Sequence, residues 1–312
     1  MQRIGFFSKK MVPNLQHNNE LPIIHVGFGH SGTTSLQANI FSRHPEIFYF
    51  GINQAGRVPY DKLGGGVFSE IKYRESRHYN ERTVRQICED LILKSPSKNK
   101  RLLLSDETFV EQPAIYHTPA MQPLETVAER LYNLFGKAQV LFTIRSQFDY
   151  VISNYNVLKK NYETLDNQKL EPFSAWFTGN QSQVRNLFLR NLDYSDAIRV
   201  YQKIFGKDMI CVLPLEIIRK EGVHAYFSRL TAATGLKIPA DFLDCYVPRN
   251  VSDNHDIRLD SCQIDFIQEK SANGNAWISR EFNLPLEDLD YPFPRSWARI
   301  FEHRLGRHCG PS

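Results

Sequence analysis

Short apolar runs alternate with helical patterns along this 312-residue chain. Continuous apolar runs predict buried strands at 22–27, 101–105, 139–144 and 209–213. Apolar positions at helical spacing predict helices at 123–135, 194–205 and 223–234, each followed by a glycine. This alternation is typical of an α/β fold with a central, mainly parallel sheet flanked by helices in three layers.

The domain organisation follows from length and patterning. We expect residues 1–20 to be an N-terminal extension and residues 21–312 to form a single domain. Residues 53–85 contain three consecutive glycines and a run of mixed charges, which predicts a long surface excursion over the sheet. Excursions of this kind often carry substrate contacts, and the alternative is a solvated charged loop.

A glycine-containing turn follows the first predicted strand and precedes a helix. It reads Gly27-Phe28-Gly29-His30-Ser31-Gly32-Thr33-Thr34-Ser35. Glycines allow a tight turn with exposed N–H groups, and the helix N-terminus adds positive potential, so the turn is suited to an anion. The residues expected to bind it are His30, Ser31, Gly32, Thr33, Thr34 and Ser35. The alternative is a helix N-cap with spare hydroxyls.

Gly27 and Gly32 have Walker A spacing, but Thr33 stands at the lysine position, which weakens an ATPase interpretation. The turn instead resembles the sulfotransferase phosphate loop, Lys/Arg-Ser/Thr-Gly-Thr-Thr, with His30 in the place of the basic residue. A second stretch, 145–155, resembles the donor motif of the same family, with Arg145 at a strand end and Ser153 eight residues later. The chain is thus similar to PAPS-dependent sulfotransferases of the bacterial and carbohydrate type, from about residue 21 to about residue 292.

The resemblance implies a P-loop fold, 3′-phosphoadenosine 5′-phosphosulfate (PAPS) as donor, PAP as product, and no metal. It implies that Arg145 and Ser153 hold the 3′-phosphate, where a guanidinium can fork onto phosphate oxygens. Residues 248–252 resemble a later segment of the family that closes over the nucleotide, which adds Arg249, Asn250 and Ser252 as donor contacts. His30 is expected to donate to the bridging oxygen or, when protonated, to balance its charge.

The resemblance also implies a catalytic base, Glu or His, on the loop after the second or third strand. Here the apolar run 101–105 ends in two carboxylates, Asp106 and Glu107. We predict Glu107 as the base, because it falls where family members with a histidine base carry that histidine. The alternatives are Asp106, Asp61, Glu70 and His117. Capping of the following turn is the structural alternative for both Asp106 and Glu107.

Composition narrows the class of partner. The 38 Lys and Arg nearly balance the 34 Asp and Glu, and a net charge of +4 fits an anionic small molecule better than nucleic acid. Five scattered cysteines without a Cys-x-x-Cys pair argue against a zinc site and a disulfide framework, so we expect a reducing, cytoplasmic setting. No stretch approaches the ~18 apolar residues of a membrane span.

The predicted reaction is transfer of a sulfuryl group to a hydroxyl or amine. A carbohydrate or glycolipid acceptor is favoured by the long polar excursion and by analogy with the motif style. Two alternatives stay open: a P-loop small-molecule kinase, with Asp106 holding magnesium after a buried strand, and a non-catalytic nucleotide-binding module. The sequence gives no indication of an oligomeric state.

Overall fold

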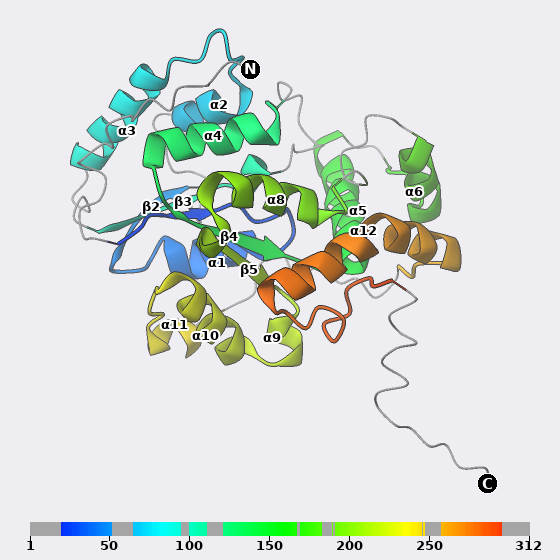
Figure 1. Cartoon of the computed structure of the whole chain (residues 1–312). Helices are drawn as coiled ribbons and strands as arrows, with labels where there is room; N and C mark the ends of the chain where they lie inside the picture. The colour runs from blue at the N-terminus through cyan, green and yellow to red at the C-terminus, as the bar shows by residue number, and fades with distance from the viewer. Residues whose placement is uncertain are drawn as a thin grey trace, which may run out of the picture.

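The computed structural model describes residues 20–51, 65–94, 100–110, 121–166, 169–182, 189, 191–244, 246 and 257–294. Within these residues, five parallel strands form one sheet in the order β2-β3-β1-β4-β5 (Figure 1). The strands are β1 Ile23–His25, β2 Ile47–Gly51, β3 Arg101–Ser105, β4 Gln139–Ile144 and β5 Ile210–Pro214. An α/β fold with a parallel sheet is confirmed.

The central strand β1 pairs with β3 on one side and with β4 on the other. Ile23 is in register with Leu103 of β3 and with Gln139 of β4. The chain therefore changes direction across the sheet at β1, and ligands of open α/β sheets bind outside the carboxyl ends of the strands at such a switch point. The segment after His25 lies at this place.

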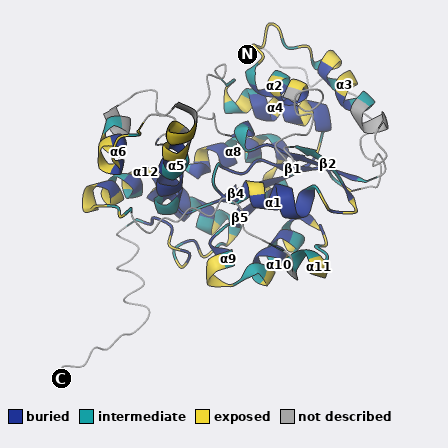
Figure 2. Cartoon of the chain, turned by 180° about the vertical axis from the view of Figure 1, so that it is seen from behind, coloured by how far each residue is buried: buried dark blue, intermediate teal, exposed yellow. Residues whose placement is uncertain are grey.

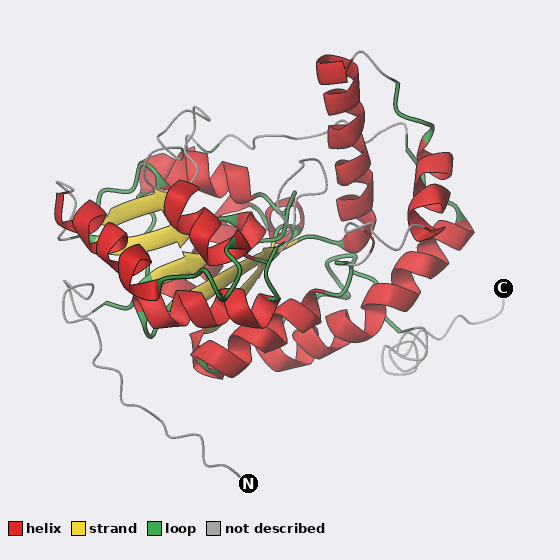
Figure 3. Ribbon diagram, turned by 90° about the horizontal axis from the view of Figure 1, so that it is seen from above, coloured by secondary structure: helices red, strands yellow, loops and turns green. Residues whose placement is uncertain are grey.

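Helices cover both faces of the sheet (Figures 1 and 3). Helices α2, α4 and α8 lie on one face, and α1, α10 and α11 on the other. The helical segments are α1 Thr33–Leu36, η1 Gln37–Phe41, α2 Gly65–Tyr73, α3 Glu81–Lys94, η3 Glu107–Phe109, α4 Leu124–Phe135, α5 Gln147–Asn161, η4 Tyr162–Asp166, α6 Phe173–Ser182, α8 Tyr194–Phe205, η5 Lys207–Met209, α9 Ile217–Lys220, α10 Val223–Thr234, α11 Ala240–Asp244 and α12 Ser261–Phe282. Among the described residues, no helix has the length and apolar character needed to span a bilayer.

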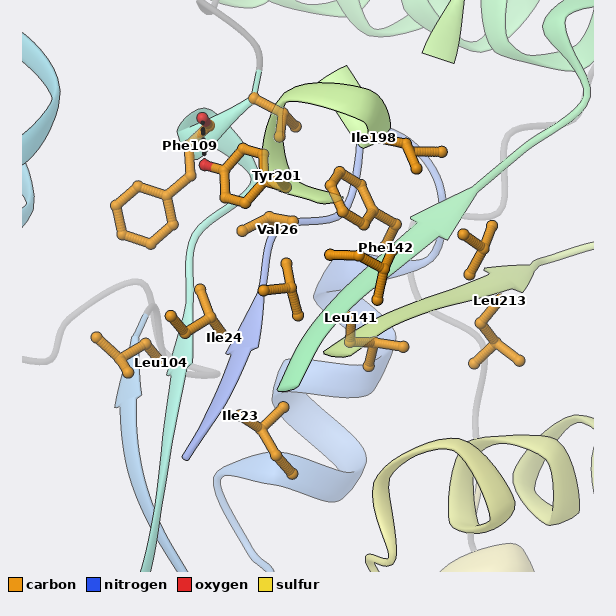
Figure 4. Packing of buried hydrophobic residues seen from close by; sticks show 14 of the residues in the cluster. Ile23, Ile24, Val26, Leu104, Phe109, Leu141, Phe142, Ile198, Tyr201 and Leu213 are labelled. Carbon is orange, nitrogen blue, oxygen red and sulfur yellow. Dashed lines mark hydrogen bonds between the residues drawn. The ribbon is translucent and has the colours of Figure 1, made fainter. Parts of the chain in front are cut away.

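The main core lies between the sheet and these helices, and Figure 2 shows much of the central sheet and the inner helix faces as buried. Tyr201 of α8 packs edge-on against Phe142 of β4, and its hydroxyl donates to the Phe109 carbonyl at 3.0 Å (Figure 4). That bond ties the turn after β3 to the core. A second apolar cluster joins α5, α6 and α12 through residues such as Trp176, Phe177 and Ile267.

Two parts of the fold differ from the sequence prediction. Strand β2 was not predicted. The expected excursion at 53–85 is helical at 65–73 and from 81 onward, in α2 and α3. The apolar residues of these two helices recur at helical spacing and enter the main core: Val67, Phe68, Ile71, Val84 and Cys88. Glycines before Val67 and charges between these positions hide the amphipathic pattern in the sequence.

Candidate active site

The phosphate loop joins β1 to α1, and α1 continues directly into the π-helical η1. The main chain holds the start of the loop to β4, since Phe28 N donates to Thr143 O at 3.1 Å. Ser31 N then donates to Phe28 O at 3.2 Å, which closes a tight turn. Its third residue, His30, has a positive φ of 61°, and Gly32 follows at 83°. Glycine suits position 32 because its φ is positive and because a Cβ on Gly32 would lie 2.7 Å from the Leu215 side chain.

His30 connects the loop to α5. Its carbonyl accepts from Arg145 Nη1 at 3.2 Å, its ring meets Tyr150 edge-on at 6.5 Å, and its side chain hydrogen-bonds with Asn154. Burial, and then the nearby Arg145 charge, lower the pKa of His30 to about 4, against the opposing effect of Asn154. His30 is therefore neutral at pH 7 and is able to donate a hydrogen bond but not to supply a positive charge.

Arg145 follows β4, where its backbone is fixed from three directions. Tyr194 donates to the Arg145 carbonyl at 2.9 Å. Ser146 N donates to the buried carboxylate of Glu216 at 2.8 Å, and Ser146 Oγ donates to the Asp290 carbonyl at 2.8 Å. Burial raises the pKa of Glu216, while the hydrogen bond from Tyr291 and the N–H of Ser146 oppose that shift. These contacts hold the half-buried Arg145 beside the phosphate loop.

Ser146, the N-cap of α5, and Asp149 have the spacing of a capping box at the start of α5, but the Ser146 side chain does not cap the helix. The hydroxyl goes to the distant Asp290 carbonyl instead, and Asp149 lies 3.7 Å from Arg219. The Ser146 hydroxyl thus donates to a distant carbonyl instead of accepting from a local backbone N–H, which the sequence pattern does not indicate.

The two carboxylates after β3 have different surroundings. Asp106 is buried, caps the turn by accepting from Thr108 N at 2.8 Å, and forms an ion pair with Lys72 of α2 at 2.8 Å. Lys72 also donates to the Thr108 hydroxyl. Glu107, in contrast, accepts from the phosphate-loop hydroxyl of Thr33 at 2.6 Å. The capping interpretation thus holds for Asp106, while Glu107 is the carboxylate that faces the loop.

Other predicted site residues fall into three groups. Ser35 is buried, Thr34 is exposed, and Ser153 is buried in α5 directly before Asn154. Glu70 pairs with Arg74 one turn away on the surface of α2. The predicted donor contacts Arg249, Asn250 and Ser252, and the alternative bases Asp61 and His117, lie outside the described residues.

Comparison with known proteins identifies the fold. No protein-family model matches the sequence, and no curated protein matches it either. Among solved structures, the sulfotransferase from Alicyclobacillus acidocaldarius superposes with a TM-score of 0.54 at 16% sequence identity, covering 86% of this chain and 98% of that one. The chain has the sulfotransferase fold.

Two further sulfotransferases also align with this fold, at lower scores. Mouse SULT7A1 complexed with PAP has a TM-score of 0.41 at 12% identity over 93% of both chains. The sulfotransferase domain from the curacin biosynthetic pathway has a TM-score of 0.37 at 13% identity, over 92% of this chain and 98% of that one.

The sulfotransferase fold brings the loop, Glu107 and Arg145 to the carboxyl ends of three adjacent strands, β1, β3 and β4. Sequence reasoning missed several supporting residues, namely His25, Lys72, Asn154, Tyr194, Glu216 and Tyr291. Two of them had a usable signal. His25 is a polar residue in an otherwise apolar strand, and Lys72 directly follows the buried Ile71 in α2. Such residues are buried only when they are paired.

Proposed function

We propose that this protein is a sulfotransferase that moves a sulfuryl group from PAPS to a hydroxyl or amine of an acceptor and releases PAP. The observation that carries the proposal is the 2.6 Å hydrogen bond between Thr33 Oγ1 and Glu107. It joins a residue of the anion-binding loop to a carboxylate able to take a proton. A donor anion on the loop would therefore lie next to a general base.

The chemistry is an in-line displacement. The acceptor oxygen or nitrogen forms a bond to sulfur, the bond from sulfur to the bridging oxygen breaks, and the acceptor proton passes to Glu107. Negative charge then builds on the oxygen that leaves with PAP. Loop N–H groups and the neutral His30 are the groups placed to stabilise that charge. None of these steps requires a metal.

In this proposal, the remaining loop hydroxyls hold the 5′-phosphate end of the donor, and Arg145 with Ser153 hold its 3′-phosphate. The 3.2 Å hydrogen bond from Arg145 to the His30 carbonyl supports a single, continuous anion site rather than two separate ones. The donor contacts Arg249, Asn250 and Ser252 remain predictions from the sequence.

For the acceptor we retain the prediction of a carbohydrate or glycolipid. Its argument from an open polar excursion no longer extends to residues 65–73 and 81–85, because these pack against the core as helices. A reducing, cytoplasmic setting remains the expectation from cysteine usage.

The kinase alternative requires Asp106 to hold magnesium. Its carboxylate already accepts from Lys72 and Thr108 in a buried pair, so the metal would have to displace a lysine. This argues against a kinase on chemical grounds.

The test of the proposed function is transfer of ³⁵S from labelled PAPS to pooled glycans, glycolipids, amines and phenols, alongside calorimetry with PAP. We expect PAP binding and labelling of one pool. PAP binding without transfer to any pool would favour the non-catalytic module. ATP turnover that needs magnesium, without PAP binding, would favour the kinase.

A further inference from the structure

A row of buried polar side chains crosses the sheet beneath the phosphate loop, and the proposed chemistry uses none of the inner ones. Its members come from η1, β3, β1, β4 and the loop: Gln37, Ser105, His25, Thr143 and Ser31. Consecutive members are joined in that order by Gln37 Nε2 to Ser105 Oγ at 2.9 Å, Ser105 Oγ to His25 Nδ1 at 2.8 Å, His25 Nε2 to Thr143 Oγ1 at 3.2 Å, and Thr143 Oγ1 to Ser31 Oγ at 2.9 Å.

Because each hydroxyl and the neutral imidazole has one hydrogen to donate, the donor and the acceptor of each hydrogen bond in this row can be assigned. Ser31 Oγ donates to the Phe28 carbonyl, so its contact with Thr143 must be one that it accepts. The Thr143 hydrogen is thereby used, and Thr143 must accept from His25 Nε2–H. A neutral ring with its hydrogen on Nε2 has a bare Nδ1, which accepts from Ser105. Ser105 thus donates to His25 and accepts from the Gln37 amide, which is compatible with the tautomer set from the Ser31 end.

Two side chains of the row, those of His25 and Thr143, also lie against the backbone of the loop at Gly27. A Cβ on Gly27 would lie 2.0 Å from Thr143 Oγ1 and 3.1 Å from His25 Nε2. The first glycine of the loop is thus needed where the row passes. Burial lowers the pKa of His25 to about 3, which keeps the ring neutral, with one donor and one acceptor.

We propose that His25 is a positioning residue: as the neutral Nε2–H tautomer it completes a one-way hydrogen-bond chain that holds the phosphate loop in its anion-binding shape. The chain ends on the Phe28 carbonyl, which closes the turn around His30. Its other limb reaches Ser105, two residues before Glu107, so it also links the loop to the strand that carries the base. The inference rests on the proposed function only for the identity of the anion.

The test compares two buried histidines. His44 also uses both ring nitrogens, with Nε2 2.8 Å from the Lys237 carbonyl and Nδ1 accepting from Glu46 N at 3.2 Å, but it lies away from the loop. Both His25→Leu and His44→Leu lose two hydrogen bonds and should lower the melting temperature. We expect only His25→Leu to weaken binding of pyrophosphate, by about ten- to a hundredfold. Equal pyrophosphate affinity in the two variants would overturn the proposal.

A second pair of variants keeps the test valid if His25→Leu does not fold. Thr143→Val removes one hydroxyl without changing shape. Thr234→Val does the same at a buried threonine whose hydroxyl bonds to the nearby backbone of Leu230 and Leu236. We expect about a three- to tenfold loss of pyrophosphate affinity for Thr143→Val. We expect none for Thr234→Val, and a loss of the same size there would contradict a role specific to the chain.

Two amide variants test which of the two His25 hydrogen bonds, the one to Thr143 or the one to Ser105, holds the loop in shape. In His25→Gln the amide nitrogen reaches the place of Nε2 and still donates to Thr143, whereas in His25→Asn the amide reaches only the place of Nδ1. We expect His25→Gln to stay within about threefold of the wild-type affinity and His25→Asn to bind as weakly as His25→Leu. The reverse order, or an Nδ1–H tautomer in the ¹⁵N spectrum of the wild-type ring, would overturn the proposal.

Two ligands separate the possible failures. Wild-type protein that binds pyrophosphate but not PAP would contradict the proposed function, and the role of His25 would still be tested by pyrophosphate binding to the same variants. Wild-type protein that binds neither ligand would overturn the proposed role of the hydrogen-bond chain as well.

Discussion

The strand ends on either side of β1 carry opposite charges and are anchored in different ways. After β3, the predicted base Glu107 follows Asp106, which forms an ion pair with the ammonium group of Lys72. After β4, the cation Arg145 precedes a neighbour, Ser146, that is tied down by uncharged donors to Glu216 and Asp290. In both places one residue fixes the backbone and the adjacent residue faces the loop.

This difference indicates that the two sides of the loop have different chemical roles. At the β3 end, Glu107 accepts from Thr33 of the loop, and at the β4 end, the Arg145 guanidinium donates to the His30 carbonyl of the loop. In the proposed reaction, proton removal from the acceptor and binding of the donor's 3′-phosphate would occur on opposite sides of β1. Variants at the two ends should therefore separate catalysis from donor binding.

The largest effect should come from Glu107→Gln. Loss of the base should lower kcat by about 10² to 10⁴-fold. The same variant should leave PAP affinity close to that of the wild type, because the carboxylate does not hold the donor. The matched control is Glu70→Gln on the surface of α2, which should leave kcat unchanged in the same ³⁵S-transfer assay. A large fall in kcat for Glu70→Gln instead would move the base to α2.

The next largest effect should come from breaking the buried ion pair between Lys72 and Asp106 at the β3 end, and it should appear in the free energy of unfolding. Lys72→Met leaves the buried Asp106 carboxylate without its cation and should lower the free energy of unfolding by about 3–5 kcal/mol. Removing the charge as well, in Lys72→Met with Asp106→Asn, should recover much of that loss in urea unfolding. Arg74→Met, which breaks only the exposed pair with Glu70, should leave the free energy of unfolding nearly unchanged. Similar losses for Lys72→Met and Arg74→Met would contradict the anchoring role of Lys72.

The strand between the two ends gives a pH signature. Folding lowers the pKa of His25 from 6.5 to about 3, so the unfolded chain takes up the proton first as the pH falls. The contribution of a neutral His25 is complete above pH 6.5 and is lost progressively towards pH 3. Between pH 6.5 and 4.5 this linkage is worth roughly 2–3 kcal/mol. Urea unfolding should show stability falling more steeply for the wild type than for His25→Gln, and parallel pH profiles would refute a buried neutral ring.

At the β4 end, Arg145→Ala should weaken PAP binding by roughly 1.5–3 kcal/mol, the value of hydrogen bonds to a charged group. Removing the guanidinium should also raise the pKa of His30 from about 4, measurable by NMR titration. Arg219→Ala, which removes an exposed arginine paired with Asp290, is the control and should change neither. Unchanged PAP affinity in Arg145→Ala would separate the β4 end from donor binding.

The smallest effect should come from Ser146→Ala. It removes the hydroxyl that donates to Asp290 and should cost about 0.5–1.5 kcal/mol of stability. If this bond aligns the Arg145 backbone, PAP affinity should also fall slightly, while kcat should not. Calorimetry and ³⁵S transfer on one preparation distinguish these outcomes.

Local signals made much of the fold predictable. The runs predicted at 101–105 and 139–144 match β3 and β4, and the helices predicted at 194–205 and 223–234 match α8 and α10. These elements were predictable because a strand buried on both faces is a continuous apolar run, and because a glycine marks the end of each helix. Helices α2 and α3 were not predicted, since charges interrupt their apolar spacing and glycines stand at the start of α2. Strand β2 was not predicted either, although its apolar run is continuous. The phosphate loop was located by its position between strand and helix.

The sequence by itself determined which residues end β3 and β4 and where the loop between β1 and α1 lies, because both depend on neighbours in the chain. Only the tertiary structure decided that Glu107 rather than Asp106 meets the loop, that His30 is neutral, and that His25 and Thr143 support the turn. Those outcomes depend on partners 34 to 118 residues apart in the chain, as for Lys72 with Asp106 and His25 with Thr143. Burial and hydrogen bonding between such distant groups arise only when the strands are brought side by side.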